Sequence, residues 1–420
     1  MSDLTVRTWA IDDPGPLLDR LPPTDGVAWL QGEDGMVGIG AAARIDPGVG
    51  PGRTSVATDA LARLAAGASV RDDVRVAGTG LVAFGSFTFD VDTHGSSLVV
   101  PEVVVGRRGR TAWLTCIGPA DDERLSASEP PLPPAVATAT AHAADRPRYA
   151  GSSVPDVRWL EAVATAVQRI RAGELEKVVL ARDHAVWSKE TFDARVLARR
   201  LAERFPGCST FVVDGLVGAT PELLVGRTGA RVESLPLAGT TGRDADPDLD
   251  AALGRALLDS AKDRWEHELL VRNVAEVLGR VCRDLHHADT PFLLQLDNVQ
   301  HLATRFVGEL APADDGSLPS ALELAGALHP TPAVAGTPTA DALAVLRELE
   351  GMDRGRYAAP VGWVDAAGDG EWGIALRCAE LSGARARLFA GAGIVADSLP
   401  EDELEETRIK LLAAQSAFRG

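Results

Sequence analysis

Two pairs of acidic residues in this chain have the spacing of metal ligands on a helix. Asp263 and Glu266 are three residues apart in a segment with helical periodicity, and Glu403 and Glu406 repeat that spacing near the C-terminus. Residues three apart lie on one face of a helix, and Mg²⁺ prefers carboxylate oxygens as ligands. The four acids together predict a magnesium site, although a solvated helix face explains either pair alone better.

Two glycine-rich segments match the dinucleotide-binding pattern but lack its structural context. Gly78–Gly80 runs into more strand instead of a helix. Gly391–Gly393 reaches a helix only after several residues, and that helix opens with acidic residues, which would repel a pyrophosphate. We therefore reject a nucleotide site, while a turn at Gly391–Gly393 still lets backbone N–H groups approach a small carboxylate.

Other catalytic patterns are incomplete. His267-Glu268 resembles the start of a zinc-protease helix, but the second histidine is missing, and no Gly-x-Ser-x-Gly elbow occurs. The four cysteines are scattered without a CxxC pair, which is typical of buried or incidental thiols in a reducing compartment. They are Cys116, Cys208, Cys282 and Cys378.

The charge balance limits the partners. The 420 residues carry 42 Lys and Arg against 60 Asp and Glu, a formal net charge of −18, which argues against nucleic acid and membrane surfaces. The N-terminus has no apolar signal core and no stretch approaches 18 apolar residues, so we expect a cytoplasmic protein. An anionic substrate also requires that the site gather cations locally.

The elements that must position these residues fall into two parts. Residues 1–125 are rich in strands and turns, including expected strands at 74–77, 81–90 and 98–105, and residues 120–155 are a Pro-, Ala- and Asp-rich connector. From 156 onward helices and strands are interspersed with few βαβ alternations, which favours an α+β fold with largely antiparallel sheets. The expected elements there are helices at 157–171, 251–282, 340–349 and from 400, and strands at 177–181, 210–214, 222–226, 232–238, 361–365, 371–378 and 387–390.

Nine segments, in order along the chain, together resemble the chorismate-binding enzymes, a family that includes anthranilate, aminodeoxychorismate, salicylate and isochorismate synthases. They are Gly173–Arg182, Ala219–Leu224, Leu235–Thr240, Ser260–Leu269, Val299–Thr304, Leu328–Ala333, Gly370–Ala379, Phe389–Val395 and Glu405–Thr407. The resemblance implies one domain over 1–420, with two packed antiparallel sheets surrounded by helices. The strands of 1–125 then join those sheets, 120–155 becomes a surface insertion, and 156–420 carries the motifs.

The resemblance also implies a ligand set. It places Mg²⁺ on Glu266 and Glu406, with Asp263 and Glu403 supporting it through water. It places the ring carboxylate of chorismate between the metal, Lys410 and the backbone of Gly391 and Gly393. Arg377 would pair with the enolpyruvyl carboxylate, as a planar guanidinium suits. The segment Ala238, Gly239 and Thr240 would also contact the substrate, and cations would then gather inside an acidic protein.

Lys177 and Glu222 bear on the reaction. Within the family, relatives that add ammonia typically lack the lysine, whereas attacking water must lose a proton that a partly neutral lysine accepts. Glu222 would protonate the departing hydroxyl, and burial beside Leu223 and Leu224 would raise its pKa for that purpose. Without the resemblance, a strand-edge lysine and a surface acid explain the two residues better.

The segment at His329 resembles the isochorismate synthase form, which implies that His329 orients the substrate or its leaving hydroxyl; a hydrogen-bonded loop histidine is the alternative. We therefore expect a Mg²⁺-dependent isomerase that converts chorismate to isochorismate, acting as a monomer in menaquinone or siderophore biosynthesis. A salicylate synthase and a non-catalytic chorismate-binding regulator are the alternatives. Ala359, at a position that is often glycine, and the bulky Trp265 depart from the family pattern.

Overall fold

The computed structural model describes residues 4–128, 132–136, 147–297 and 299–418. The strands are β1 (Leu4–Ile11), β2 (Gly26–Gln31), β3 (Asp34–Ile39), β4 (Ala43–Ile45), β5 (Ser69–Asp72), β6 (Val82–Ser86), β7 (Ser97–Val100), β8 (Val103–Arg108), β9 (Thr111–Pro119), β10 (Arg148–Gly151), β11 (Lys177–Trp187), β12 (Ser209–Val213), β13 (Leu216–Thr220), β14 (Leu223–Thr228), β15 (Arg231–Leu235), β16 (Leu237–Gly242), β17 (Cys282–His287), β18 (Phe292–Gln295), β19 (Val299–Ala303), β20 (Phe306–Leu310), β21 (Gly336–Thr337), β22 (Pro360–Asp365), β23 (Gly370–Ile374), β24 (Cys378–Ser382) and β25 (Arg385–Ile394). The α-helices are α1 (Arg53–Ala66), α2 (Glu123–Ser126), α3 (Asp156–Arg171), α4 (Ala194–Arg204), α5 (Pro247–Asp259), α6 (Ala261–Gly279), α7 (Ala321–Leu328), α8 (Thr339–Leu349) and α9 (Pro400–Gln415).

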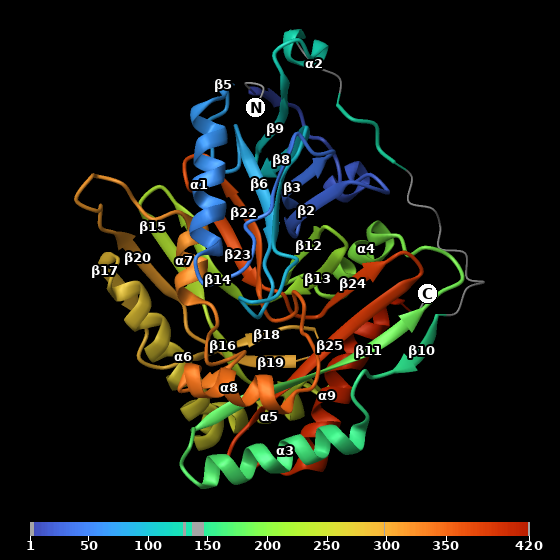
Figure 1. The fold of residues 1–420 in the computed structure, drawn as a ribbon, viewed down its shortest axis with the longest axis vertical. Helices are drawn as coiled ribbons and strands as arrows, with labels where there is room; N and C mark the ends of the chain where they lie inside the picture. Colours follow the sequence, from blue (N-terminus) through green and yellow to red (C-terminus); the bar gives the residue numbers. More distant parts are fainter. Residues whose placement is uncertain (1–3, 129–131, 137–146, 298, 419–420) are drawn as a thin grey trace.

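These strands form two large sheets and a small one, with helices around them (Figure 1). Over the described residues, the larger sheet has 13 strands in the order β10-β11-β25-β24-β13-β12-β2-β3-β8-β9-β1-β5, with β21 beside β11. The second has nine, in the order β17-β20-β15-β14-β23-β22-β6-β7-β4, and the third is β16-β19-β18. The pairs are antiparallel except β1 with β5. The expected α+β class with packed antiparallel sheets is confirmed, and the small third sheet is an addition.

The two large sheets are in contact at Trp29. Trp29 of β2 stacks on Phe211 of β12, and its indole Nε1 donates to Glu371 of β23 in the other sheet at 2.9 Å. Strands from the first 125 residues occur in both sheets, as the resemblance implied. The strand expected at 74–77 is wrong, because the Asp72 carboxylate accepts hydrogen bonds from the N–H groups of Val74 and Arg75 and turns the chain there. Helix α1 was not predicted.

The helix expected over 251–282 is two helices. Helix α5 ends at Asp259 and α6 begins at Ala261, because Ser260 has an extended ψ of 114° and its hydroxyl accepts from the N–H of Asp263. A serine in that position is an N-cap, which starts a new helix on its own axis. The break orients the first turn of α6, which carries Asp263 and Glu266.

The turn expected at Gly391–Gly393 is also wrong, because those residues lie inside β25. Gly391 pairs with Ala181 and Gly393 with Val179 in the long ladder between β25 and β11. The strand expected to run from 371 to 378 ends at Ile374, and Arg377 adopts a left-handed φ of 44° between β23 and β24. The sheets therefore fix the backbone of Gly391 and Gly393, which lie in a strand, and of Arg377, which lies between two strands.

The segment 120–155 lies partly outside the described residues. Its described parts include helix α2 and the short strand β10, which pairs with the C-terminal end of β11. The segment therefore contains regular secondary structure as well as connecting chain. In the part of the chain that the structure describes, no helix is long and apolar enough to span a membrane.

Candidate active site

A cavity of about 270 Å³ opens where the small sheet meets the larger one. In Figure 1 the small sheet lies at the centre of the molecule, and α6 contacts its strands β16 and β19. The ionisable side chains that line the cavity are Lys177, Glu222, Lys262, Asp263, Glu266, His301, Arg354, Tyr357, Arg377, Glu406 and Lys410. Five of them are Lys or Arg, so cations do gather locally in this acidic protein.

Strand β11 places Lys177 at the inner end of the cavity. Lys177 is the first residue of β11, is 4% exposed, and holds its Nζ 3.3 Å from Oε2 of Glu266 on α6. Across the ladder, a Cβ on Gly393 would lie 3.0 Å from Cε of Lys177. Gly393 is therefore small because the lysine side chain passes directly over it.

Glu222 enters the same cavity from the segment between β13 and β14. Its side chain is buried, and burial raises the pKa of its carboxyl from 4.5 to about 8, while the nearby Lys177 works in the opposite direction. The raised pKa is the direction that the apolar neighbourhood predicted. A neutral carboxylic acid and a buried lysine thus line one cavity, which is the composition of an acid–base site.

The four acids come from two helices, α6 and α9. Asp263, Glu266 and Glu406 line the cavity, and Glu406 pairs with Lys410 at 2.6 Å. Burial works to raise the pKa of the Glu406 carboxyl, but Lys410, Lys262 and Lys177 together hold it below its usual value. Glu403 is buried behind them, where burial and the Glu406 charge raise its pKa although Ser398 donates to it.

The carboxylate oxygens of these four acids are ligands that suit Mg²⁺. Their side chains do not surround a common point in this structure. Among the described residues no three acidic, histidine or cysteine side chains lie close enough to enclose a metal ion. Lysines neutralise Glu266 and Glu406, and Oε2 of Glu403 is buried with no hydrogen-bond partner within the described part of the chain. A buried unpartnered carboxylate oxygen beside a second acid is suited to a cation with oxygen ligands.

Arg377 is held by a histidine that was not predicted as a site residue. Its Nη2 lies 3.2 Å from Nε2 of His301, and its Nη1 lies 3.2 Å from Sγ of Cys208. Burial lowers the pKa of His301 to about 3, and the Arg377 charge adds to this. Because a guanidinium only donates, Nε2 accepts, and the proton of the neutral ring is on Nδ1, which donates to Thr240 at 3.0 Å. His301 belongs to Val299–Thr304, one of the nine segments that resemble the family, but the resemblance implied no role for this histidine.

His329, by contrast, does not line the cavity. Its Nε2 donates to the carbonyl of Ala358 at 3.1 Å, and its ring packs edge-on against Phe89. These contacts are those of a hydrogen-bonded loop histidine, and the expected role of His329 at the substrate stays a prediction. Of the other expected site residues, Ala238, Gly239, Thr240, Gly391 and Lys410 all line the cavity.

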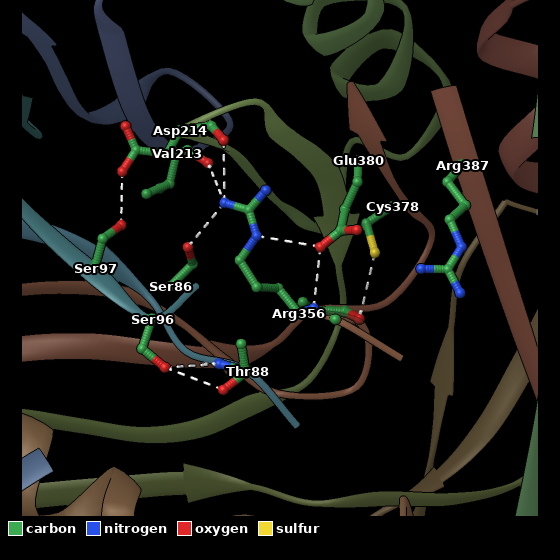
Figure 2. Close-up of polar contacts among 12 residues, drawn as sticks. Ser86, Thr88, Ser96, Ser97, Val213, Asp214, Arg356, Cys378, Glu380 and Arg387 are labelled. Carbon is green, nitrogen blue, oxygen red and sulfur yellow. Dashed lines mark hydrogen bonds and ion pairs between the residues drawn. The ribbon is translucent and has the colours of Figure 1, made fainter. Parts of the chain in front are cut away.

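The residues on both sides of Tyr357, Arg356 and Ala358, are fixed by hydrogen bonds in the loop before β22. Figure 2 shows the guanidinium of Arg356 donating to Ser86 and to the carbonyls of Val213 and Asp214, while Glu380 accepts from its Nε and backbone N–H. These contacts join the loop to both large sheets. Tyr357 then stacks on Phe389 of β25 with ring centroids 5.1 Å apart.

The two departures from the family pattern do not face the cavity. The next residue in the loop, Ala358, has a left-handed φ of 61°, while Ala359 has no positive φ and is buried. Neither Ala359 nor Trp265 is among the lining residues. Neither side chain therefore forms part of the cavity wall.

Fold and cavity together define a class of protein: an α+β enzyme whose cavity gathers lysine and arginine side chains beside acidic ones. Comparison with known proteins supports this class. Residues 28–419 match the model of the chorismate-binding enzyme family. A Mycobacterium tuberculosis protein assigned as the isochorismate synthase MenF is 40% identical over 367 residues, 82% of this chain and 90% of that protein.

Two further relatives are similar. Isochorismate synthase DhbC of Bacillus subtilis is 44% identical over 259 residues, which cover 59% of this chain and 64% of DhbC. The solved structure of MenF, the menaquinone-specific isochorismate synthase from Escherichia coli, matches with a TM-score of 0.79 at 25% identity, over 100% of this chain and 95% of that one. The chain belongs to the chorismate-binding enzyme family.

Proposed function

We propose that this chain is an isochorismate synthase, an isomerase that adds water at C2 of chorismate and expels the hydroxyl from C4. One observation carries the proposal: the buried Lys177 and the buried, protonated Glu222 line the same cavity. Relatives named isochorismate synthase, which match across most of the chain, support the same reaction.

The two residues supply a balanced pair of proton transfers. Lys177 accepts a proton from the attacking water as the C2–O bond forms, and Glu222 donates its proton to the C4 hydroxyl, which leaves as water. Each transfer by a positioned group lowers the barrier by roughly 3–5 kcal/mol. One water enters and one leaves, so the product is an isomer of the substrate.

The cations of the cavity orient the two carboxylates of the substrate. Arg377, fixed by His301 and Cys208, presents a guanidinium fork for the enolpyruvyl carboxylate. Lys410 lies beside the strand that carries Gly391, whose carbonyl accepts from its Nζ at 2.9 Å, and would meet the ring carboxylate. Thr240 belongs to the same wall, through its bond to His301.

We infer that Mg²⁺ is the cofactor, held by Glu266 and Glu406 with Asp263 and Glu403 in support. Bound there, the ion would neutralise the ring carboxylate and withdraw electron density from the reacting ring. For it to bind, Lys177 must release Glu266 and Lys410 must release Glu406. Release from Glu266 would free the Lys177 nitrogen within the cavity, where its neutral amine form would meet the attacking water.

The test is incubation of the purified chain with chorismate and Mg²⁺, followed by chromatography of the products. Isochorismate as the main product supports the proposal, and its loss in Lys177→Ala and Glu222→Ala assigns it to this site. Fluorescent salicylate as the main product would identify a salicylate synthase instead. An ammonia-dependent product would identify an amine-adding enzyme, and binding without turnover would identify a regulator.

A further inference from the structure

One edge of β11 has a gap in its strand partners. Along its other edge β11 pairs continuously with β25, from Val178 to Trp187. On the gapped edge, β21 pairs only with Lys177 and Val178, and β10 pairs only from Ala185 onward. The backbone groups of Val179 and Ala181 fall between these two short strands, in a buried part of the sheet where unpaired groups are costly.

A buried ion pair fills part of this gap, since the Val179 N–H donates to the Ala335 carbonyl and the Ala181 carbonyl accepts from the indole of Trp159. Nη2 of Arg354 donates to the carbonyl of Val179 at 2.6 Å, and Oε2 of Glu350 accepts from the N–H of Ala181 at 2.9 Å. The two side chains bond each other twice, from Nε to Oε1 and from Nη2 to Oε2, both at 2.7 Å. One donor and one acceptor are thus presented to β11, as a neighbouring strand would present them.

Arg354 also holds the segment of the cavity wall that lies next to β11. Its Nη1 donates to the carbonyl of Val334 at 2.8 Å, and its guanidinium lies 4.1 Å from the ring centroid of Phe89. Val334 and Ala333 line the cavity, and so does Arg354 itself. The Arg354 and Glu350 side chains are 3% and 4% exposed.

The pair is poorly explained as a source of stability. Buried ion pairs contribute little net stability, because the desolvation of both charges offsets their attraction. Its hydrogen bonds, in contrast, fix the backbone two and four residues after Lys177. We propose that Glu350 and Arg354 are positioning residues that set where the Lys177 ammonium group lies in the cavity, an inference that rests on the proposed function.

Arginine is required for this arrangement. Its planar fork reaches the Val179 carbonyl, the Val334 carbonyl and the carboxylate at once, whereas a lysine ammonium lacks that geometry. Displacement of a proton-transfer group by about 1 Å costs on the order of 100-fold in rate. Loss of the fork should therefore reduce turnover much more than substrate binding, which depends on Arg377 and Lys410.

The chain contains a matched control. Arg347 on α8 forms the same two-pronged bond with Asp90, at 2.8 and 2.9 Å, but its side chain is 52% exposed and makes no contact with β11. Both arginines line a second hollow of about 280 Å³ beside α8. Arg347→Lys therefore tests for general effects of losing an arginine fork in this region.

The experiment compares kcat for isochorismate formation and the dissociation constant of chorismate in the wild type, Arg354→Lys and Arg347→Lys. We expect Arg354→Lys to lower kcat by roughly 10- to 100-fold with less than about a 3-fold change in the dissociation constant, and Arg347→Lys to change neither. Wild-type kcat in folded Arg354→Lys would overturn the inference. A wild-type protein that makes no isochorismate would instead refute the proposed function.

A charge swap separates positioning from simple ion pairing. The double variant Glu350→Arg with Arg354→Glu keeps an ion pair but faces the Ala181 N–H with a donor and the Val179 carbonyl with an acceptor. We expect it to remain as slow as Arg354→Lys, and recovery of kcat would contradict the proposal. Should these variants not fold, Glu350→Gln is measured together with hydrogen exchange at the Ala181 amide. Faster exchange with reduced kcat supports positioning, and faster exchange at unchanged kcat overturns it.

Discussion

The ammonium nitrogen of Lys177 lies 3.3 Å from Oε2 of Glu266. The residue proposed as general base is thus the ion partner of a residue proposed as metal ligand. The two side chains are 5% and 12% exposed, so solvent screens the pair only weakly. A cation that binds Glu266 must therefore displace Lys177, which couples metal binding to the freedom of the base.

Replacement of Lys177 should consequently have opposite effects on metal affinity and on turnover. Lys177→Met removes the competing cation, so we expect Mg²⁺ to bind about 3- to 10-fold more tightly in calorimetry without substrate. Turnover should fall about 100- to 10,000-fold because the proton acceptor is gone, while chorismate still binds. Weaker Mg²⁺ binding in this variant would show that Lys177 does not compete for Glu266.

Glu222 should make the protein less stable as the pH rises. Its folded pKa of about 8 exceeds the ordinary 4.5, so between these values the unfolded chain loses a proton that the folded protein keeps. The free energy of unfolding should therefore drop by roughly 3–5 kcal/mol across that window. Glu222→Gln removes this loss, so it should raise the melting temperature at pH 8 but not at pH 4.5. An equal change at both pH values would contradict the raised pKa.

The same protonation should limit the activity of the wild type. Glu222 can donate its proton only below its pKa, so kcat should decline as the pH passes about 8. Stopped assays of isochorismate between pH 6 and 10 measure this limb. Glu222→Gln should lose activity at every pH, because the amide has no acidic proton, and a variant with the wild-type profile would exclude Glu222 as the donor.

Gly393→Ala should impair the enzyme without unfolding it. The added methyl group would lie 3.0 Å from Cε and 3.4 Å from Nζ of Lys177, so the flexible lysine must move. We expect kcat to fall by about 10-fold or more, with a change in the melting temperature of only a few degrees. Gly242→Ala is the control, since a Cβ there meets no atom within 4 Å. Equal kcat in the two variants would show that Lys177 tolerates displacement.

Two glutamates on α6 allow a test of where Mg²⁺ binds. Glu266→Gln should abolish the increase in melting temperature that Mg²⁺ produces in the wild type, because a carboxylate ligand is lost. Glu268→Gln, two residues later on the exposed face and paired only loosely with Arg272 at 3.8 Å, should retain it. A response to Mg²⁺ that persists in Glu266→Gln but not in Glu268→Gln would place the ion elsewhere.

The histidines show where prediction from the sequence reached its limit. His329 lies in a segment with family character and was expected at the substrate, yet its ring bonds the Ala358 carbonyl outside the cavity. His301 lies in another segment with family character, Val299–Thr304, but no role was expected of it, and it is the histidine that contacts Arg377. Because a lone histidine has neither spacing nor periodicity, its direction follows from how β19 and the loop before β24 pack together.

The errors in the elements have local causes of a similar kind. Ser260 broke the predicted long helix because its hydroxyl caps Asp263, although the residues on either side continue a helical pattern. Gly391 and Gly393 suggested a turn by composition, but the partner β11 extends through them and keeps them in a strand. Glycine in a strand then allows close approach of Lys177.

The sequence by itself determined which chemistry is present: acids paired three apart on two helices, Lys177 at the start of a strand, Glu222 among apolar residues, and the family motifs in order. Such information is local, because periodicity fixes which side chains share a face of one element. Only the tertiary structure decided that Lys177 meets Glu266, 89 residues away, and that Glu350 and Arg354 occupy a gap in β11. Contacts between elements depend on how those elements pack, and spacing along the chain does not encode that geometry.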